Sequence, residues 1–186
     1  MSLHSVNEIN SLADPLKQFL STFVISTPNC EAFAPSVSKQ LELRAQSFSW
    51  PTIQADNTTV MWGGHERQYA GKQMRGGDWG VTFTEVYSGD IIDGFKKWCN
   101  GFHNFKNGTI SLFENYATTI EVQLLNPELY DPGVTAAVAK KIQLLRAWPT
   151  NVAVAGDIQP SSPDPVEISV TFHYDYFLMG DEINGQ

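Results

Sequence analysis

The sequence contains little cysteine and no long apolar run. Cys30 and Cys99 are the only two cysteines in 186 residues, too few for a disulfide-stapled secreted domain and without the CxxC spacing of a zinc or redox site. No stretch reaches the roughly 18 apolar residues of a membrane-spanning helix, and the N-terminal region lacks a basic segment followed by an apolar one. We therefore predict two buried free thiols and a protein kept in a cytoplasm, unless a larger assembly carries it out.

Basic residues are scarce, especially towards the C-terminus. Lys and Arg number 12 against 20 Asp and Glu, which gives a net charge of -8. From Thr150 onwards there is no Lys or Arg at all, but there are six acidic residues: Asp157, Asp164, Glu167, Asp175, Asp181 and Glu182. A protein of this charge repels nucleic acid and anionic membranes as a whole.

Motifs for catalysis, metal binding and cofactor binding are also missing. The sequence has four histidines, which show neither HExxH spacing nor clustering: His4, His65, His103 and His173. No GxSxG motif is present. His173 and Asp175 share a strand face, but alternation alone explains that. The glycine-rich stretch Gly71–Gly77 is not a phosphate-binding loop, because it leads into a strand instead of a helix. We expect no enzyme, no cofactor and no metal, although a pair of glycosidase carboxylates stays open because acidic residues are abundant.

Alternating apolar and polar residues dominate the chain, which is long enough for one domain with a substantial core. The clearest case is Val166–Tyr176, where the even-numbered residues are apolar or aromatic. Other predicted strands are Phe19–Ile25, Gln40–Trp50, His65–Ala70, Trp79–Tyr87, Tyr116–Leu125 and Val138–Trp148, whereas residues 34–38 and 54–59 resemble loops. The fold class expected is mainly β, an antiparallel sandwich or barrel.

One segment has helical periodicity. The apolar residues of residues 88–105 recur at spacings of four and three and form one stripe: Ile91, Phe95, Trp98, Phe102 and Phe105. Ser88 or Asp90 is the expected N-cap. We predict one amphipathic outer helix on the β body and a second short helix within residues 6–12.

The tryptophans have two interpretations. Trp79 and Trp98 belong to apolar patterns and are expected in the core, whereas Trp50, Trp62 and Trp148 lie at predicted strand ends. Exposed tryptophans on a β body are typical of carbohydrate-binding modules. Because proline cannot donate to a strand ladder, Trp148–Pro149 is predicted to end a strand, with Thr150 and Asn151 beginning a turn.

Four segments, taken in order, resemble a known family. They are LELRAQSFSWPTI from Leu41, ERQYAGKQMRGGDWGVTFTE from Glu66, IIDGFKKWCNGF from Ile91, and LLRAWPTNV from Leu144 with the later strand VEISVTFHYDYF. Together they resemble the inner tail tube proteins of contractile-tailed phages, the T-even type in particular. The most specific part is Trp148–Pro149–Thr150–Asn151 with the final strand. The match covers residues 17–177, which implies an N-terminal arm (1–16), a tail-tube β domain (17–177) and a C-terminal tail (178–186).

The resemblance implies a structural virion protein without enzymatic activity. Six subunits of the family form a ring, and rings stack into a tube inside a sheath, through whose channel DNA passes without specific binding. The implied partners are further copies of the chain and the tail sheath, tape-measure, baseplate and tail terminator proteins, with no membrane, and assembly in the bacterial host cytoplasm before incorporation in the virion tail. We expect Glu121, Glu167 and Asp175 to contribute to an acidic channel wall. The alternatives are a tube protein of a tailocin or type VI-like secretion system, a tube-initiating baseplate protein and, more distantly, a carbohydrate-binding β-sandwich.

Overall fold

The computed structural model describes residues 21–26, 28, 41–85, 87–125, 138–155, 161, 163–180 and 183. Within them, antiparallel strands dominate, which confirms the predicted fold class. The main sheet has the order β1-β8-β9-β10-β5-β2, and β11 also pairs with β9. Its strands are β1 (Ser21–Ile25), β2 (Ala45–Phe48), β5 (Gly77–Thr84), β8 (Thr118–Leu125), β9 (Val138–Val154), β10 (Glu167–Tyr174) and β11 (Tyr176–Met179).

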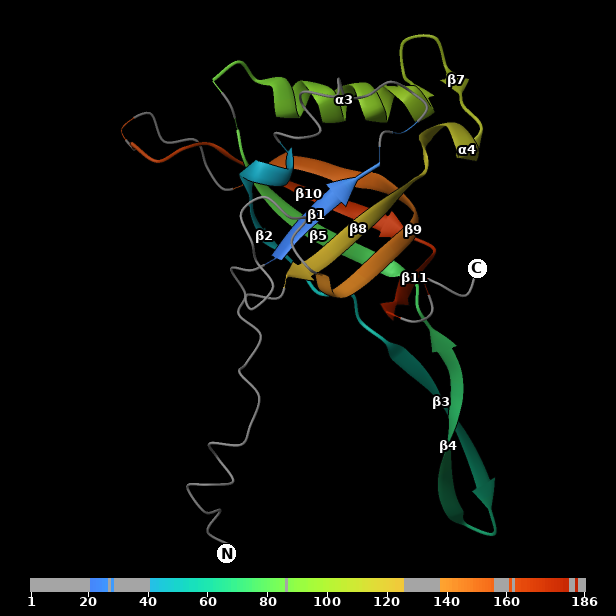
Figure 1. Cartoon of the computed structure of the whole chain (residues 1–186). Coiled ribbons are helices and arrows are strands. Elements are labelled where there is room, and N and C mark those ends of the chain that lie inside the picture. Colours follow the sequence, from blue (N-terminus) through green and yellow to red (C-terminus); the bar gives the residue numbers. More distant parts are fainter. Residues whose placement is uncertain are drawn as a thin grey trace, which may run out of the picture.

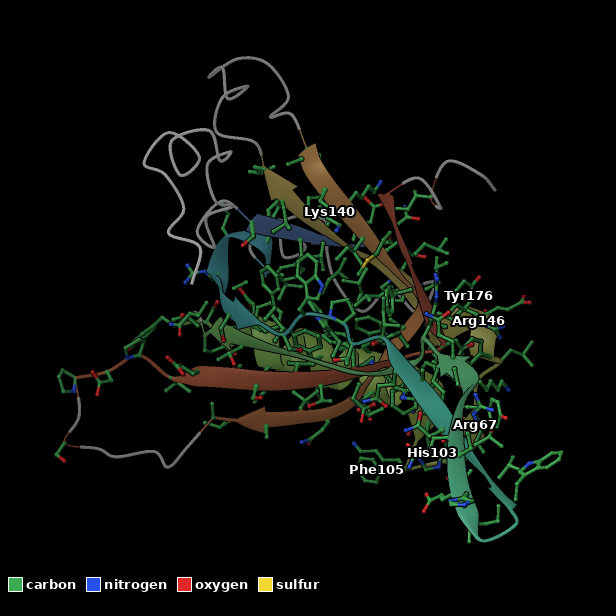
Figure 2. The ribbon with its side chains drawn as sticks, turned by 90° about the horizontal axis from the view of Figure 1, so that it is seen from below. Arg67, His103, Phe105, Lys140, Arg146 and Tyr176 are labelled. Carbon is green, nitrogen blue, oxygen red and sulfur yellow. The ribbon has the colours of Figure 1, made fainter. Side chains whose placement is uncertain are left out.

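The long strand β9 folds this sheet into two layers (Figures 1 and 2). Its first half pairs with β8 and β11, and its second half pairs with β10. We call β1, β8, β11 and the first half of β9 the first layer, and β2, β5, β10 and the second half of β9 the second layer. Between the halves, Arg146 has a φ of 57°, and the pairing with β8 shifts register beside it. A bulge of this kind bends a strand, so it lets β9 serve both layers.

The core fills the space between the layers. Alternate residues of each central strand point inwards, as in β10, where Ile168, Val170, Phe172 and Tyr174 are buried. The rings of Phe23, Trp79 and Phe172 lie in edge-on or tilted contact across this space, with centroids 5.8–5.9 Å apart. Aromatic burial of this extent is the main stabilising term of a small β body.

Helix α3 (Asp90–Phe102) covers one end of the body (Figure 1). Ile91, Phe95 and Trp98 are buried and Phe102 is partly buried against the core, so four residues of the expected stripe face the strands. The fifth, Phe105, is 74% exposed because the helix ends at Phe102. A short strand pair, β6 (His103–Asn104) with β7 (Thr109–Ile110), and the one-turn helix α4 (Phe113–Tyr116) follow.

The helix start is capped differently from the prediction. Gly89 occupies the N-cap position, and the Ser88 hydroxyl donates to the Asp90 carboxylate rather than capping the helix. The backbone N–H groups of Ile91 and Ile92 instead donate to the Glu85 carboxylate at 3.2 and 2.9 Å. A carboxylate here satisfies two otherwise unpaired N–H groups and complements the helix dipole.

Replacing Glu85 with alanine should therefore lower the free energy of unfolding by about 1 kcal/mol, the usual cost of a lost cap. Ser88→Ala is the matched control, and it should change stability little because that hydroxyl does not bond the helix backbone. Urea titration followed by tryptophan fluorescence measures both variants. Equal losses in the two would show that Glu85 does not cap the helix.

The predicted strand stop at Trp148–Pro149 is wrong. β9 continues to Val154, and Pro149 lies opposite Phe172. Proline is tolerated because the pairing shifts register at this point, and the Thr150 hydroxyl donates to the Thr171 carbonyl at 3.0 Å. At a bulge the strand ladder is interrupted, so the N–H group that proline lacks is not needed for a ladder hydrogen bond.

Three further expectations differ from the structure. Residues 54–59 are not a loop but part of strand β3 (Gln54–Trp62), and the strand expected over Gln40–Trp50 is limited to β2, with residues 41–44 helical. The alternation of Val166–Tyr176 ends at Asp175, so Tyr176 is partly exposed and Phe177 is buried instead. The predicted helix in residues 6–12, Cys30, His4 and residues 34–38 lie outside the described residues.

Candidate interaction surfaces

A two-stranded hairpin projects from the body (Figure 1). It consists of β3 and β4 (His65–Met74), paired from Trp62 with His65 at the tip to Gln54 with Met74 at the base. All ten residues of β4 and eight of the nine of β3 are exposed. An isolated hairpin is at best marginally stable in water, so contact with a further surface would stabilise this one.

The hairpin turn follows from two adjacent glycines. Gly63 and Gly64 have φ values of 53° and 85°, as a two-residue turn of the primed type requires. The Trp–Gly–Gly–His sequence is thus the local signal for this hairpin. Alternation predicted only the part of β4 over residues 65–70, because neither face of the hairpin is buried by the body.

The hairpin combines exposed apolar side chains with a balanced charge. Met61 and Trp62 at the tip are 69% and 71% exposed, and Tyr69 and Met74 are also exposed. Residues 54–74 contain two basic and two acidic residues, so the hairpin is neutral, whereas the whole chain carries -8. Exposed aromatic and methionine side chains are typical of a protein interface.

The outward side of the second layer is a different kind of surface. It presents short hydroxyl side chains, which we call the hydroxyl face: Ser47, Thr82, Thr84, Ser169 and Thr171. Asn151 and Ala153 pair beside Thr171 and Ser169. Asp78 and His173 lie opposite each other at one end, with His173 Nδ1 2.9 Å from the Asp78 carboxylate, and Glu167 lies at the other end. His173 therefore pairs with Asp78 and not with Asp175.

The outward side of the first layer carries longer side chains around Glu121. Lys141 Nζ lies 2.9 Å from the Glu121 carboxylate, and the Gln143 amide donates to it at 2.6 Å. Burial raises the pKa of Glu121, but the bonds from Lys141 and Gln143 outweigh this, so the pKa lies below the usual 4.5. Glu121 is therefore a paired carboxylate.

This lowered pKa predicts a pH dependence. A carboxyl whose pKa is lower in the folded than in the unfolded protein stabilises the fold above the unfolded value, and the stabilisation is lost as the pH falls through the folded value. Glu121→Gln should therefore be less stable than the parent at pH 7, and the difference should shrink as the pH falls below 4.5. Chemical denaturation of both proteins at pH 7 and at a pH below 4.5 measures this difference in stability. A difference that stays constant with pH would contradict the assignment.

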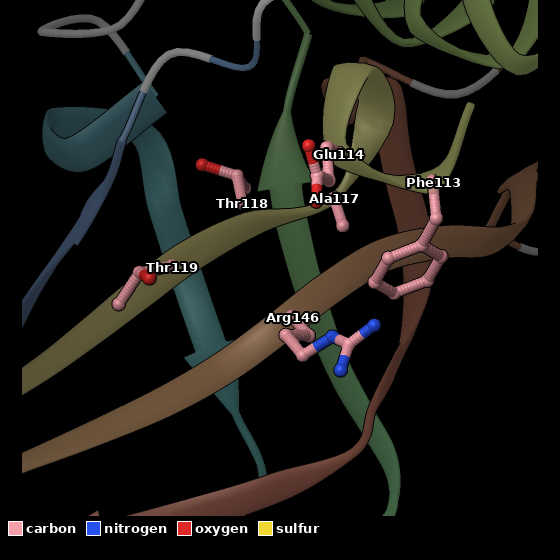
Figure 3. A pocket seen from close by; sticks show the side chains of 6 residues that line it. All are labelled: Phe113, Glu114, Ala117, Thr118, Thr119 and Arg146. Carbon is pink, nitrogen blue, oxygen red and sulfur yellow. The ribbon is translucent and has the colours of Figure 1, made fainter. Parts of the chain in front are cut away.

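Trp148, the first residue of the Trp148–Asn151 motif, lies in an aromatic and charged cluster beside the β9 bulge. The Arg146 guanidinium lies 4.4 Å from the Phe113 ring centroid, and its Nε lies 3.1 Å from the Asp175 carboxylate. Figure 3 shows the Arg146 side chain directed towards Phe113 at a pocket of about 340 Å³ lined by Phe113, Glu114, Ala117, Thr118, Thr119 and Arg146. Arg146 thus contacts both the Phe113 ring and the Asp175 carboxylate. These contacts stabilise the positions of β9 and β11 beside the bulge.

The three ambiguous tryptophans do not form a sugar-binding platform. Trp148 packs against Phe113, Tyr116 and His173, with ring centroids 4.8–6.2 Å away. Trp62 lies at the hairpin tip, and Trp50 follows β2 at the other end of the hairpin. Among the described residues, the structure shows no cluster of His, Cys, Asp and Glu that could hold a metal, and no helix long and apolar enough to cross a membrane.

The expected acidic residues do not share one surface. Glu121 lies on the outward side of the first layer, Glu167 at the edge of the hydroxyl face, and Asp175 at the break between β10 and β11. Asp78 is the acidic residue of the hydroxyl face that sequence reasoning missed. The sequence signal for Asp78 was its position next to Trp79. The Trp79 side chain is buried, and the next residue of a strand points the opposite way, so Asp78 points outwards.

The geometry describes a two-layered β body with a projecting hairpin. The family model described as phage tail tube protein matches residues 14–180, and the chain belongs to this family. The predicted family is thereby confirmed. No curated protein matches the sequence.

Solved structures of contractile injection systems share the fold. One is a chain of an extracellular contractile injection system, the PVC sheath-tube complex in its extended state, with 16% identity, a TM-score of 0.60, and coverage of 96% of this chain and 99% of that chain. The PVC sheath/tube terminator has 14% identity, a TM-score of 0.62, and coverage of 91% and 99%. The tube-terminating cap of the anti-feeding prophage has 13% identity, a TM-score of 0.61, and coverage of 91% and 93%. At these identities the likeness concerns the fold.

Proposed function

We propose that this chain is the structural subunit of the inner tail tube of a contractile-tailed phage. Subunits join side by side in hexameric rings, the rings stack, and DNA passes through the channel during ejection. Membership of the phage tail tube family supports the tube role. The observation that carries self-assembly is the β3–β4 hairpin, which extends from the body with its apolar tip exposed.

The edges of the main sheet support the same proposal. β1 and β2 each pair on one side only within the described residues. An unpaired strand edge is a template for another chain, and proteins that do not cover such edges within one subunit complete them in an assembly. A ring in which neighbouring subunits contact one another along these edges would protect them.

The proposed partners are further copies of this chain and the sheath, tape-measure, baseplate and tail terminator proteins of the same virion. The fold shared with chains of a sheath-tube complex and a sheath/tube terminator supports the sheath and terminator. Residues 1–16 and 178–186 are proposed as terminal segments flanking a tube domain of residues 17–177, and the family match over 14–180 supports this division. Assembly is proposed in the host cytoplasm, and the mature location is the virion tail.

The second candidate is a tube protein of a tailocin or of a type VI-like secretion system. The fold likeness favours it, because two of the matched chains come from an extracellular contractile injection system.

Electron microscopy of the purified full chain, alone and with the sheath protein encoded nearby, tests the proposal. We expect annular particles and hollow filaments whose formation increases with concentration. A protein that stays monomeric at every concentration, alone and with the sheath, would overturn it. Capsid and portal genes beside the gene would favour a phage, and their absence beside sheath and baseplate genes would favour the injection system.

A further inference from the structure

We infer that an exposed apolar patch after helix α3 is the docking site for the β3–β4 hairpin of a second copy of this chain, and that the hairpin binds it through one of its two faces. We call this site the turn patch, and its members are Phe105, Ile110 and Leu112. The inference rests on the proposed function, because it names the surface on which one ring would receive the next.

The turn patch holds large apolar side chains in water on a backbone that is fixed by hydrogen bonds. Its three members are 74–78% exposed. In the turn between β6 and β7, the Gly108 N–H donates to the Asn104 carbonyl at 2.8 Å and the Lys106 N–H donates to the Asn104 side-chain oxygen at 3.1 Å. Beyond β7, the Ser111 N–H donates to the Phe102 carbonyl at 3.1 Å. Apolar side chains presented in this way mark an interaction surface.

The hairpin has two unlike faces, because residues directly opposite each other in an antiparallel pair point to the same side. One face, which we call the aromatic face, carries Thr58 with Tyr69, Val60 with Arg67, and Trp62 with His65. The other face carries Asn57 with Ala70, Thr59 with Gln68, and Met61 with Glu66. The aromatic face is therefore the one that can bury a continuous apolar surface.

The aromatic face is partly organised within the single chain. The Arg67 guanidinium lies 5.6 Å from the Tyr69 ring centroid, so its long side chain follows the face. Val60, the partner of Arg67 in the strand pair, is the one residue of β3 that is partly buried. Side chains that already hold their bound arrangement lose less conformational entropy on binding, which favours this face for docking.

The hairpin and the turn patch lie at opposite ends of the body but on the same side of it. Figure 1 shows β3 and β4 extending below the body and β7 above it. Figure 2, seen from below, places Arg67 of the hairpin on the same side of the body as His103 and Phe105. A second copy displaced along the line between these two ends brings its hairpin to the turn patch of the first.

A contact between these two surfaces is head-to-tail, because each copy offers its hairpin at one end and its turn patch at the other. Head-to-tail contacts repeat along an open array, whereas a contact between identical surfaces joins two copies and then stops. Stacked rings need the first kind of contact. The aromatic face therefore pairs with the turn patch rather than with another hairpin.

The charges of the two elements suit this contact. Copies of a chain with a net charge of -8 repel one another, so elements that meet should not carry the excess negative charge. Residues 54–74 of the hairpin are neutral, and residues 103–112 contain Lys106 and no Asp or Glu. Contact between the hairpin and the turn patch thus avoids the acidic parts of both copies.

Thiol cross-linking in assembled tubes tests the inference. In a parent with Cys30→Ser and Cys99→Ser, Lys106→Cys beside the turn patch is combined with Arg67→Cys on the aromatic face. The matched control combines Lys106→Cys with Gln68→Cys, because Gln68 is the next residue of β4, is also exposed and lies on the opposite face. Both pairs and the three single-cysteine variants are treated with a short bis-maleimide and separated by denaturing electrophoresis.

We expect the Arg67→Cys pair to give a ladder of covalent dimers, trimers and longer chains, because each copy contacts one copy above it and one below. The Gln68→Cys pair and the single-cysteine variants should stay monomeric on the gel. An equal ladder from the Gln68→Cys pair, covalent dimers from a single-cysteine variant, or monomers from both pairs would overturn the inference and leave the tube proposal intact. Failure of the unsubstituted chain to form tubes would instead count against the proposed function.

A mixing experiment in the natural background keeps the inference testable if the cysteine-free parent does not assemble. Phe105→Ser with Ile110→Ser removes the turn patch, and Trp62→Ser with Tyr69→Ser removes the aromatic face. We expect each variant alone to form single rings without tubes. Rings of the two variants, once mixed, should form pairs of rings and nothing longer, because the intact hairpins of the first then meet the intact turn patches of the second.

Electron microscopy distinguishes single rings, ring pairs and tubes in these samples. The matched control is Leu43→Ser with Tyr87→Ser, since these two side chains are also highly exposed but lie outside both elements, and it should form tubes. Tubes from the turn-patch variant alone, or single rings only after mixing, would overturn the inference.

Discussion

Replacing both Met61 and Trp62 with serine should abolish the stacking of rings into tubes while leaving the body folded. These side chains form the tip of the β3–β4 hairpin, are 69% and 71% exposed, and contribute nothing to the core. Burial of each at an interface stabilises a contact by about 1.5–3 kcal/mol, so their joint loss should weaken association by about a hundredfold or more. Large apolar side chains at the centre of an interface commonly dominate its energy.

Sedimentation velocity and electron microscopy across a concentration series measure this effect. The matched control replaces Thr59 and Gln68 with serine. These two residues are paired across the same hairpin but carry no large apolar surface. The control should assemble like the natural chain, and circular dichroism should show the same strand content in all three proteins. Normal tubes from the Met61 and Trp62 variant would show that the hairpin tip is not an assembly contact.

Trp98→Ala should lower the free energy of unfolding by about 3–5 kcal/mol, the cost of removing a fully buried tryptophan. Trp98 is fully buried, packs against Phe95 and Phe172, and its indole N–H donates to the Tyr116 carbonyl at 2.7 Å. Its loss leaves a cavity between α3 and the strands and an unpaired carbonyl in α4. A domain stabilised by about 5–15 kcal/mol would lose a large fraction of its stability.

Two further variants separate the causes of this loss. Trp98→Phe retains most of the packing but not the hydrogen bond, so it should cost less than the alanine variant. Trp50→Ala removes a tryptophan that is 44% exposed and should change stability by about 0.5 kcal/mol or less. Urea titration followed by circular dichroism measures all three. Similar losses in Trp98→Ala and Trp50→Ala would contradict the packing of α3 described above.

The sequence by itself determined the elements in which one face is buried. β10 was predictable because Ile168, Val170 and Phe172 alternate with polar residues, and α3 because Ile91, Phe95 and Trp98 recur at helical spacing. Both patterns record a local rule, namely which side of an element meets the core. The family resemblance was likewise readable from segments in order along the chain.

Only the tertiary structure decided how these elements meet. The hairpin β3–β4 has no buried face, so its periodic signal is weak: β4 was predicted only over residues 65–70, and part of β3 was taken for a loop. Pro149 is accommodated by a bulge whose partner strand is more than twenty residues away in β10. For the same reason, alternation could mark Glu121 and Glu167 as outward-facing but could not show that they face opposite ways. Strand pairing joins residues that are far apart in the sequence. Until the strands have paired, it is not defined on which side of the molecule a polar strand face lies.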